Sequence, residues 1–237
     1  MAVSLNHRLS RDCADCELRS VRMFCNLDDD AFSSFQLLGT QKSFIRGEKI
    51  FQEEEPGRGI FLICKGQVKL TCSSKRGKTL ILKIAMPGDL LGLGAVISGS
   101  RYEVSAEAIE PTQVKEIERE QFLAFLQKHG QASLHAAKAL SEEYKAAFVE
   151  ARRLALSGSA ASRLAGLLLD WGRLSSCGKQ EMRFTMALTH EELADMVGSS
   201  RETVTRVLTR FKKEGWIASH GSSILIQAPQ RLKDLSV

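Results

Sequence analysis

The spacing of apolar residues divides the chain into three stretches. From Thr40 to Ile117, short apolar runs are separated by glycines, which is typical of antiparallel strands joined by tight turns. From Gln131 to Leu156, apolar residues recur at alternating intervals of three and four, the pattern of one long amphipathic helix. The remaining third contains three short helical patterns and extended runs on either side of them. We therefore expect an α+β protein with an N-terminal roll or barrel of strands, a long helix and a helical C-terminal domain.

The same patterns suggest where the domains meet. We expect residues 1–130 to form a cysteine-containing segment and a β-roll, 131–157 a helix that joins two copies, and 158–237 a separate domain. Ser157–Ala160 is small and polar and is the best candidate for a linker. Short helices are expected over Asp28–Leu38 and Arg119–Lys128, and Gly92–Gly94 is interpreted as a turn between strands.

The long helix carries a heptad seam, in which small and apolar side chains recur on one side. Three alanines on this seam would let a second helix approach closely, so we predict a homodimer. Packing of the helix against the roll of its own chain remains the alternative. The predicted seam consists of Ala137, Leu140, Tyr144, Ala147, Ala151 and Leu154.

Two short helices separated by a tight turn are predicted between Leu188 and Trp216. Thr189 precedes Glu192 by three residues, the capping-box spacing that begins a helix, and Gly198 is placed to end it. Ser199 and Glu202 repeat the capping spacing and are expected to begin the second helix. Two helices of this length with this turn are typical of a helix-turn-helix.

The second of these helices has the composition of a DNA-reading surface. Its apolar residues form one stripe, which leaves the polar residues at its front facing outward. Between Arg201 and Lys213 there are five basic residues and one acidic residue. A solvated face with no ligand is the plainer alternative. The residues predicted to contact double-stranded DNA are Thr189, Ser200, Arg201, Glu202, Thr203, Thr205 and Arg206.

Residues 217–227 (IASHGSSILIQ) are predicted to form a hairpin that makes this a winged helix-turn-helix. Its turn lies near Gly221-Ser222, and His220, Ser222 and Ser223 would approach the phosphate backbone of DNA.

Composition adds only broad limits. The 33 basic and 28 acidic residues give a net charge of +5, which indicates a mildly basic protein and no particular partner. No apolar run approaches the ~20 residues that span a bilayer, and residues 1–16 contain no apolar signal core, so we expect a cytoplasmic protein without membrane contact. In that compartment the six cysteines are expected to be thiols or metal ligands rather than disulfides.

Several segments together resemble the CRP/FNR family of bacterial transcription regulators over nearly the whole chain. RGEKIFQEEEPGRGIFLICKGQVKL is similar to the family's first barrel strands, KIAMPGDLLG to its G-D-x-x-G turn, and VGSSRETVTRVLTRFKKEGWI to its recognition helix. The resemblance implies a jelly-roll sensor barrel, a dimerisation helix and a winged helix-turn-helix. It further implies a homodimer that binds a palindromic operator, with RNA polymerase as a second partner.

Within the recognition helix, Arg201, Glu202 and Arg206 match the three base-reading positions of the family's catabolite-activator branch. The chemistry agrees with this match. Arginine can donate two hydrogen bonds to guanine, and glutamate can accept one from cytosine. We therefore expect half-sites with a G-T-G-A-like core, in which Arg201 contacts guanine.

The signal that the barrel senses is less clear from the sequence. The cyclic-nucleotide branch of the family holds its ligand with a glutamate and an arginine, whereas this chain has Leu93 and Val104 at the matching positions. An apolar pair cannot balance a buried phosphate. Arg101 is near enough in sequence to substitute if the loop were rearranged, so a cyclic-nucleotide-responsive regulator stays open as an alternative.

The iron–sulfur branch uses three N-terminal cysteines and one from the barrel. Cys13, Cys16 and Cys25 lie in the matching region, but Lys115 stands where the fourth cysteine belongs. An iron–sulfur cluster, another metal such as zinc, a thiol sensor and ordinary cysteines all remain open, so the cofactor is uncertain. A redox, oxygen or nitric-oxide type of signal is favoured. The residues that could complete a metal site are His7, Asp12, Cys64 and Cys72.

Two functions outside transcription can also be weighed. Cupin oxygenases are small β-rolls that need several histidines inside the barrel. None of the five histidines here lies between Thr40 and Ile117, so no enzyme is expected. A ligand-binding barrel that regulates a protein partner is the other alternative, and the basic second helix argues against it.

Overall fold

The structure is a computed structural model that describes residues 16, 19, 22–74, 79–156, 158–176, 181–186 and 188–236. The side chains at 153–156 and 174–176 fall outside this description, and so does Cys13. Within the described ranges, no helix is long and apolar enough to cross a membrane.

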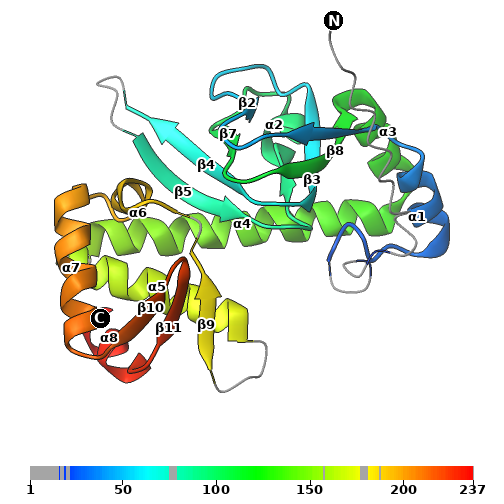
Figure 1. Ribbon diagram of the computed structural model, residues 1–237. Coiled ribbons are helices and arrows are strands. Elements are labelled where there is room, and N and C mark those ends of the chain that lie inside the picture. Colours follow the sequence, from blue (N-terminus) through cyan, green and yellow to red (C-terminus); the bar gives the residue numbers. More distant parts are fainter. Residues whose placement is uncertain are drawn as a thin grey trace, which may run out of the picture.

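The N-terminal half forms a β-roll of two four-stranded sheets, ordered β1-β8-β3-β6 and β2-β7-β4-β5, in which every strand pair is antiparallel (Figure 1). This confirms the α+β class and the antiparallel roll. The strands are β1 (Thr40–Phe44), β2 (Lys49–Phe51), β3 (Gly59–Lys65), β4 (Val68–Ser73), β5 (Thr79–Ala85), β6 (Leu90–Leu91), β7 (Ser105–Ala108) and β8 (Thr112–Glu118).

Strand β3 is buried on both faces because it separates two apolar cores. Its odd-numbered residues Phe61 and Ile63 point into the core between the two sheets. Its even-numbered residues Ile60 and Leu62 point to the other side, where they meet the helices that flank the roll. The side chains of a strand alternate between its faces, so one continuous apolar run serves both cores.

Three short helices flank the roll: α1 (Asp29–Gln36), α2 (Leu93–Ser98) and α3 (Arg119–Lys128). The predictions for α1 and α3 are confirmed. The interpretation of Gly92–Gly94 as a strand turn is wrong, because Gly92 is the N-cap of α2 and Leu93 begins that helix. Gly92 adopts φ 78°, which glycine reaches without strain, so the chain can leave β6 and enter α2 at once.

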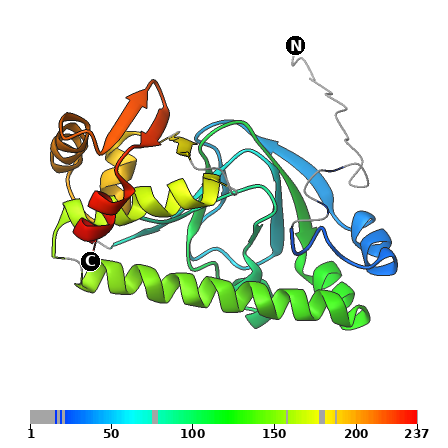
Figure 2. The same cartoon turned by 90° about the horizontal axis from the view of Figure 1, so that it is seen from below.

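Helix α4 (Gly130–Leu156) confirms the long helix and runs along the whole molecule, past the roll and on to the C-terminal domain (Figure 1, Figure 2). Ala132 and Ala136 at its beginning are buried in the core that α1 and α3 share. Every residue from Ser141 to Val149 is exposed, including Tyr144 at 66% and Phe148 at 55% of their surface. The middle of α4 therefore carries exposed apolar side chains that this chain does not cover.

The C-terminal domain has its own apolar core, to which the barrel adds Ile81 of β5 and Ile109. Its three-stranded sheet has the order β10-β11-β9. Helix α8 begins at a proline, which suits the first position of a helix, and it has no counterpart among the predicted elements. The elements are α5 (Ala160–Ser176), β9 (Met182–Thr185), α6 (His190–Met196), α7 (Arg201–Lys213), β10 (Ile217–His220), β11 (Ser223–Ile226) and α8 (Pro229–Ser236).

Candidate nucleic-acid interface

Helix α6 begins with the predicted capping box. The Thr189 hydroxyl accepts a hydrogen bond from the Glu192 backbone at 3.2 Å, and the Thr189 backbone N–H donates to the Glu192 carboxylate at 2.9 Å. Two orphan N–H groups are thereby satisfied. At the other end Gly198 adopts φ 58°, which confirms its predicted role in ending the helix.

Helix α7 begins one residue later than the sequence suggested. Its N-cap is Ser200, whose hydroxyl accepts from the Thr203 backbone N–H at 3.3 Å. The prediction of Ser199 as the cap is wrong, because the Ser199 N–H still belongs to the turn and donates to the Ala194 carbonyl at 2.9 Å. Serines at 199 and 200 offer the same hydroxyl, so spacing to Glu202 alone could not decide between them.

One stripe of α7 holds the helix against the domain. The stripe is almost fully buried, and it meets the apolar faces of α5 and α6 in one core. Arg163 on α5 adds a polar tie, since its Nε donates to the Val197 carbonyl at the end of α6 at 2.6 Å. This carbonyl is one of those that a helix end leaves unpaired. The stripe consists of Val204, Val207, Leu208 and Phe211.

The opposite side of α7 presents Arg201, Glu202, Thr205 and Arg206 at the surface, all exposed. Within the described part of the chain no hydrogen bond engages the guanidinium group of either arginine. The Thr205 hydroxyl donates to the Arg201 carbonyl at 2.9 Å and lies 2.8 Å from Nδ1 of His190 on α6. Thr205 thus links the two helices, a role that sequence spacing did not reveal.

The exposed carboxylate of Glu202 at the front of α7 has a lowered pKa. Its own backbone N–H and the Ser200 hydroxyl hydrogen-bond to it, and together they lower its pKa. A glutamate in this state accepts hydrogen bonds and cannot donate them, which suits it to the exocyclic amine of cytosine.

The other three predicted DNA contacts, Thr189, Ser200 and Thr203, make hydrogen bonds within the motif. Thr189 closes the capping box, while Ser200 and Thr203 bond to each other at 3.1 Å. Their hydroxyls set where α6 and α7 begin, so the geometry brings Arg201, Glu202 and Arg206 forward and leaves these three at the helix ends.

The predicted wing is present. Strands β10 and β11 pair antiparallel with His220 opposite Ser223, and Gly221 in the turn adopts φ 58°. The wing is fixed to α7 through Trp216, whose ring stacks on Phe211 with centroids 5.1 Å apart.

In the β-roll, positions that match the nucleotide-binding residues of the family have other roles. Leu93 is 1% exposed and belongs to an apolar core. Arg101 donates from Nη1 to the Glu54 carbonyl at 2.5 Å, where Glu54 adopts the unfavourable φ 67°. Between the sheets Phe51 stacks on Tyr102 at 4.1 Å and on Phe61 at 5.4 Å. Aromatic rings therefore fill part of the interior of the roll.

Lys115 is buried at 6% exposure, where the iron–sulfur branch has its fourth cysteine. Its ammonium donates to the carbonyls of Phe35 and Gln36 at 2.9 and 2.8 Å, at the C-terminal end of α1. Positive charge is favoured there by the helix dipole. Lys115 thus attaches α1 to β8 and cannot take the part of the missing ligand.

Three of the cysteines line one cavity. Cys16, Cys25 and Cys64 line a small apolar cavity of about 40 Å³, together with two phenylalanines of α1 and two aliphatic residues of β3. Among the described residues no group of three His, Cys, Asp or Glu side chains is arranged to hold a single metal ion. A set of thiols matches soft metals and iron–sulfur chemistry better than oxygen-ligated ions. Cys72 lies on β4, and burial raises the pKa of its thiol.

Comparison with known protein families finds a match for the C-terminal domain and a match for the β-roll. Residues 162–235 match the Crp-like helix-turn-helix domain, and residues 41–129 match the cyclic nucleotide-binding domain. Among the relatives, the nitrogen fixation regulation protein FixK of Bradyrhizobium diazoefficiens is 28% identical over 94% of this chain and 93% of its own length. The CRP-like cAMP-activated global transcriptional regulator of Mycobacterium tuberculosis is 30% identical over 80% of this chain and 84% of its own.

Among solved structures, FixK2 from Bradyrhizobium japonicum superposes with a TM-score of 0.76 at 25% identity, covering 85% of this chain and 98% of that one. Of these relatives, the one from Mycobacterium tuberculosis is a transcriptional regulator, and FixK is a nitrogen fixation regulation protein. The fold, the two matched domains and these relatives together show that the chain belongs to the CRP/FNR family of transcription regulators.

Proposed function

We propose that this protein is a homodimeric transcription regulator that reads a palindrome with G-T-G-A-like half-sites. The observation that carries the proposal is the front of α7, where Arg201, Glu202 and Arg206 are exposed together on a helix whose other side is fully anchored. Arg201 would donate two hydrogen bonds to a guanine, and Glu202 would accept one from a cytosine. The serine and threonine hydroxyls at the helix ends and the wing would meet phosphates.

Dimerisation would occur through α4. The predicted seam positions Ala137, Tyr144, Ala147 and Ala151 are exposed in the single chain, and Leu140 is half-buried. The side chain of Leu154 lies outside the described residues. Phe148, which the seam did not include, extends the exposed apolar surface because its ring lies 4.7 Å from that of Tyr144. A second copy of α4 would cover it, and the two recognition helices would then enter successive major grooves about 34–36 Å apart.

The direct test is a binding titration with the full-length protein and a duplex that carries the palindrome. We expect binding at least about a thousandfold tighter than to a scrambled duplex at the same salt concentration. Equal affinity for both duplexes would indicate a barrel that regulates a protein partner. The DNA-bound dimer would in turn present its outer surface to RNA polymerase.

For the input, we propose a redox, oxygen or nitric-oxide type of signal received at the cavity of Cys16, Cys25 and Cys64. What supports this is that a barrel strand and the N-terminal segment contribute thiols to the same apolar cavity. Cys13, which lies outside the described residues, is the fourth thiol close in sequence. Together these four would hold an iron–sulfur cluster, whose chemistry is the exchange of electrons and reaction with oxygen or nitric oxide.

Anaerobic purification followed by a visible spectrum and analysis of iron and acid-labile sulfide tests the input. Iron and sulfide should be present in wild type and be lost in Cys64→Ser, whereas Cys72→Ser, a matched change on β4, should retain them. Protein without iron and sulfide would remove the cluster and leave thiol chemistry at this cavity. Tight binding of cyclic AMP, with increased DNA affinity, would instead favour the cyclic-nucleotide alternative.

A further inference from the structure

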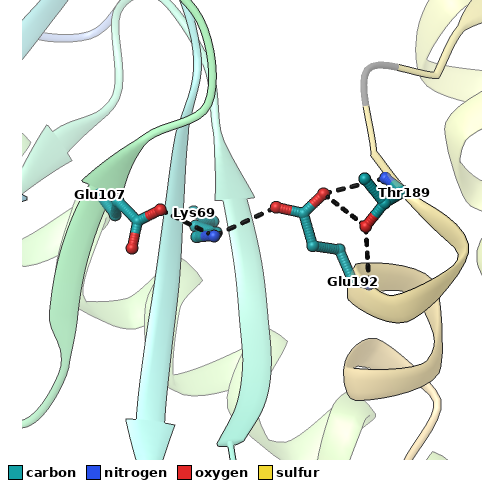
Figure 3. A network of polar contacts seen from close by, with 4 residues as sticks. All are labelled: Lys69, Glu107, Thr189 and Glu192. Atoms are coloured by element: carbon teal, nitrogen blue, oxygen red, sulfur yellow. Dashed lines mark hydrogen bonds and ion pairs between the residues drawn. The ribbon is translucent and has the colours of Figure 1, made fainter. Parts of the chain in front are cut away.

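An ion pair connects the β-roll to the first helix of the DNA-binding motif (Figure 3). The Lys69 ammonium of β4 lies 2.8 Å from Glu107 of β7 and 3.1 Å from Glu192 of α6. The side chain of Lys69 is 17% exposed and that of Glu192 is 16% exposed. Lys69 and Glu192 are 123 positions apart in the sequence, and the contact exists only because the two domains are docked on each other.

The Glu192 carboxylate performs two tasks at once. One oxygen accepts from Lys69, and the other closes the capping box by accepting from the backbone and the hydroxyl of Thr189 (Figure 3). Lys69 thereby holds the N-terminal end of α6. His190, the residue after Thr189, contacts Thr205 of α7, so the chain of polar contacts extends from Lys69 into α7.

Both partners stay charged in this contact. Burial works against the charge on Lys69, but hydrogen bonds to Glu107 and Glu192 outweigh it and raise its pKa. Burial would raise the pKa of Glu192, yet the Thr189 backbone and Lys69 hold it below its ordinary value. On β5, the strand next to β4, Ile81 is 2% exposed within the core of the C-terminal domain, so an apolar contact between the domains accompanies the polar one.

The docked arrangement leaves the DNA-reading side open. Arg201, Glu202 and Arg206 are exposed while Lys69 holds α6. Only a short connection at residues 157–159 separates α4 from α5, and small polar residues such as these do not by themselves fix an angle between helices. The contact of α6 with β4 and β5 would then orient α7 relative to α4.

We propose that Lys69 is a positioning residue for DNA recognition, which fixes the separation of the two recognition helices and so sets the half-site spacing that the dimer prefers. The inference rests on the proposed homodimeric DNA-binding function. A residue of the sensor roll that touches no base would then determine specificity for the operator, because a palindrome is bound tightly only when both helices fit their grooves together.

The test compares variants on a series of duplexes. Lys69→Met removes the charge and keeps the aliphatic stem. Glu192→Gln removes the partner charge but retains the capping box, since glutamine caps as glutamate does. Glu107→Gln is the matched control, because it changes a Lys69 contact that stays within the roll. The duplexes carry the palindrome at its best spacing, the palindrome with one or two base pairs inserted at its centre, or a single half-site.

Wild type should bind one spacing best. Lys69→Met and Glu192→Gln should each bind that spacing about tenfold more weakly, about 1.4 kcal/mol, with little change on the half-site duplex. Their discrimination between spacings should fall by a similar factor. Lys69→Arg should restore both properties, and Glu107→Gln should resemble wild type. A merely structural role would lower binding to all duplexes equally.

If Lys69→Met and Glu192→Gln both kept the spacing preference of wild type, the inference would be overturned. Tighter binding of the palindrome by these variants would also overturn it, because the ion pair would then hold the domain in an arrangement that binds DNA less well. Wild-type protein that bound no palindrome would overturn the proposed function and this inference together. A thermal melting curve for each variant identifies a loss of folding, and the Lys69→Arg variant then decides whether charge at this position governs spacing.

Discussion

In the C-terminal domain, the residues that match the family's base-reading positions lie on the surface of α7. In the β-roll, by contrast, two positions that match effector-binding residues of the family hold buried side chains. Arg201 and Arg206 are exposed, while Leu93 and Lys115 are buried. The output side is therefore an exposed set of polar groups on one anchored helix. In the β-roll, Leu93 packs in an apolar core and Lys115 caps a helix, at positions where branches of the family have an effector ligand. Similarity in one domain therefore does not establish the ligand of the other.

The largest predicted effect concerns the dimer contact through α4, which would bring two copies of the α7 surface together. Tyr144→Glu places a charge in the exposed apolar centre of α4, so the dimer should dissociate and affinity for the palindrome should fall about a hundredfold or more, because the second half-site no longer adds to the first. Light scattering and a binding titration measure the two effects. Lys145→Glu, which adds the same side chain beside the seam, should remain dimeric. A dimeric Tyr144→Glu protein with wild-type affinity would contradict the role of α4.

The next effect concerns the β-roll, where the buried Lys115 attaches α1 to β8. Lys115→Met removes the buried ammonium that donates to the carbonyls of Phe35 and Gln36 at the end of α1, and hydrogen bonds from a charged donor are among the stronger ones, so the free energy of unfolding should fall by about 2–3 kcal/mol. Urea denaturation measures it. Lys42→Met on β1 removes an exposed lysine paired with Glu116 and should cost at most about 1 kcal/mol. Equal losses in the two variants would show that Lys115 does not hold α1.

The smallest effect concerns the contact between the domains. The lowered pKa of Glu192 means that its contribution is present above the ordinary value of 4.5 and is lost as pH falls through the lowered pKa. The raised pKa of Lys69 means that its contribution is present below 10.5 and is lost as pH rises through the raised pKa. The affinity ratio of wild type to Glu192→Gln on the palindrome should therefore stay constant between about pH 6 and 9. A ratio that falls across this range would exclude an ion pair that is charged throughout.

The two domains also differ in how far the sequence predicts them. Thr189, Glu192 and Gly198 specify α6 through neighbours in the sequence, and the capping box and the turn glycine formed as predicted. Spacing failed by one residue at Ser200, where two adjacent serines present the same group. The long helix likewise followed from local periodicity.

What the sequence could not supply depends on contacts between distant residues. Lys115 and Phe35 are 80 positions apart, and nothing near either residue indicates that a lysine caps α1. Cys64 lines the same cavity as Cys16 and Cys25, which lie far from it in the sequence. Helix α2 was missed because glycines at Gly92 and Gly94 are as typical of turns as of a helix start.

The central claim is that the exposed front of α7 reads bases. The most direct measurement compares wild type with Arg201→Ala on a set of palindromes in which each base pair of the half-site is replaced in turn, at one salt concentration. Arg201→Ala should weaken binding by about 1–3 kcal/mol and should lose discrimination at a single guanine position, with preferences elsewhere retained. Uniform weakening on every duplex, with all base preferences intact, would make Arg201 a phosphate contact and contradict the account.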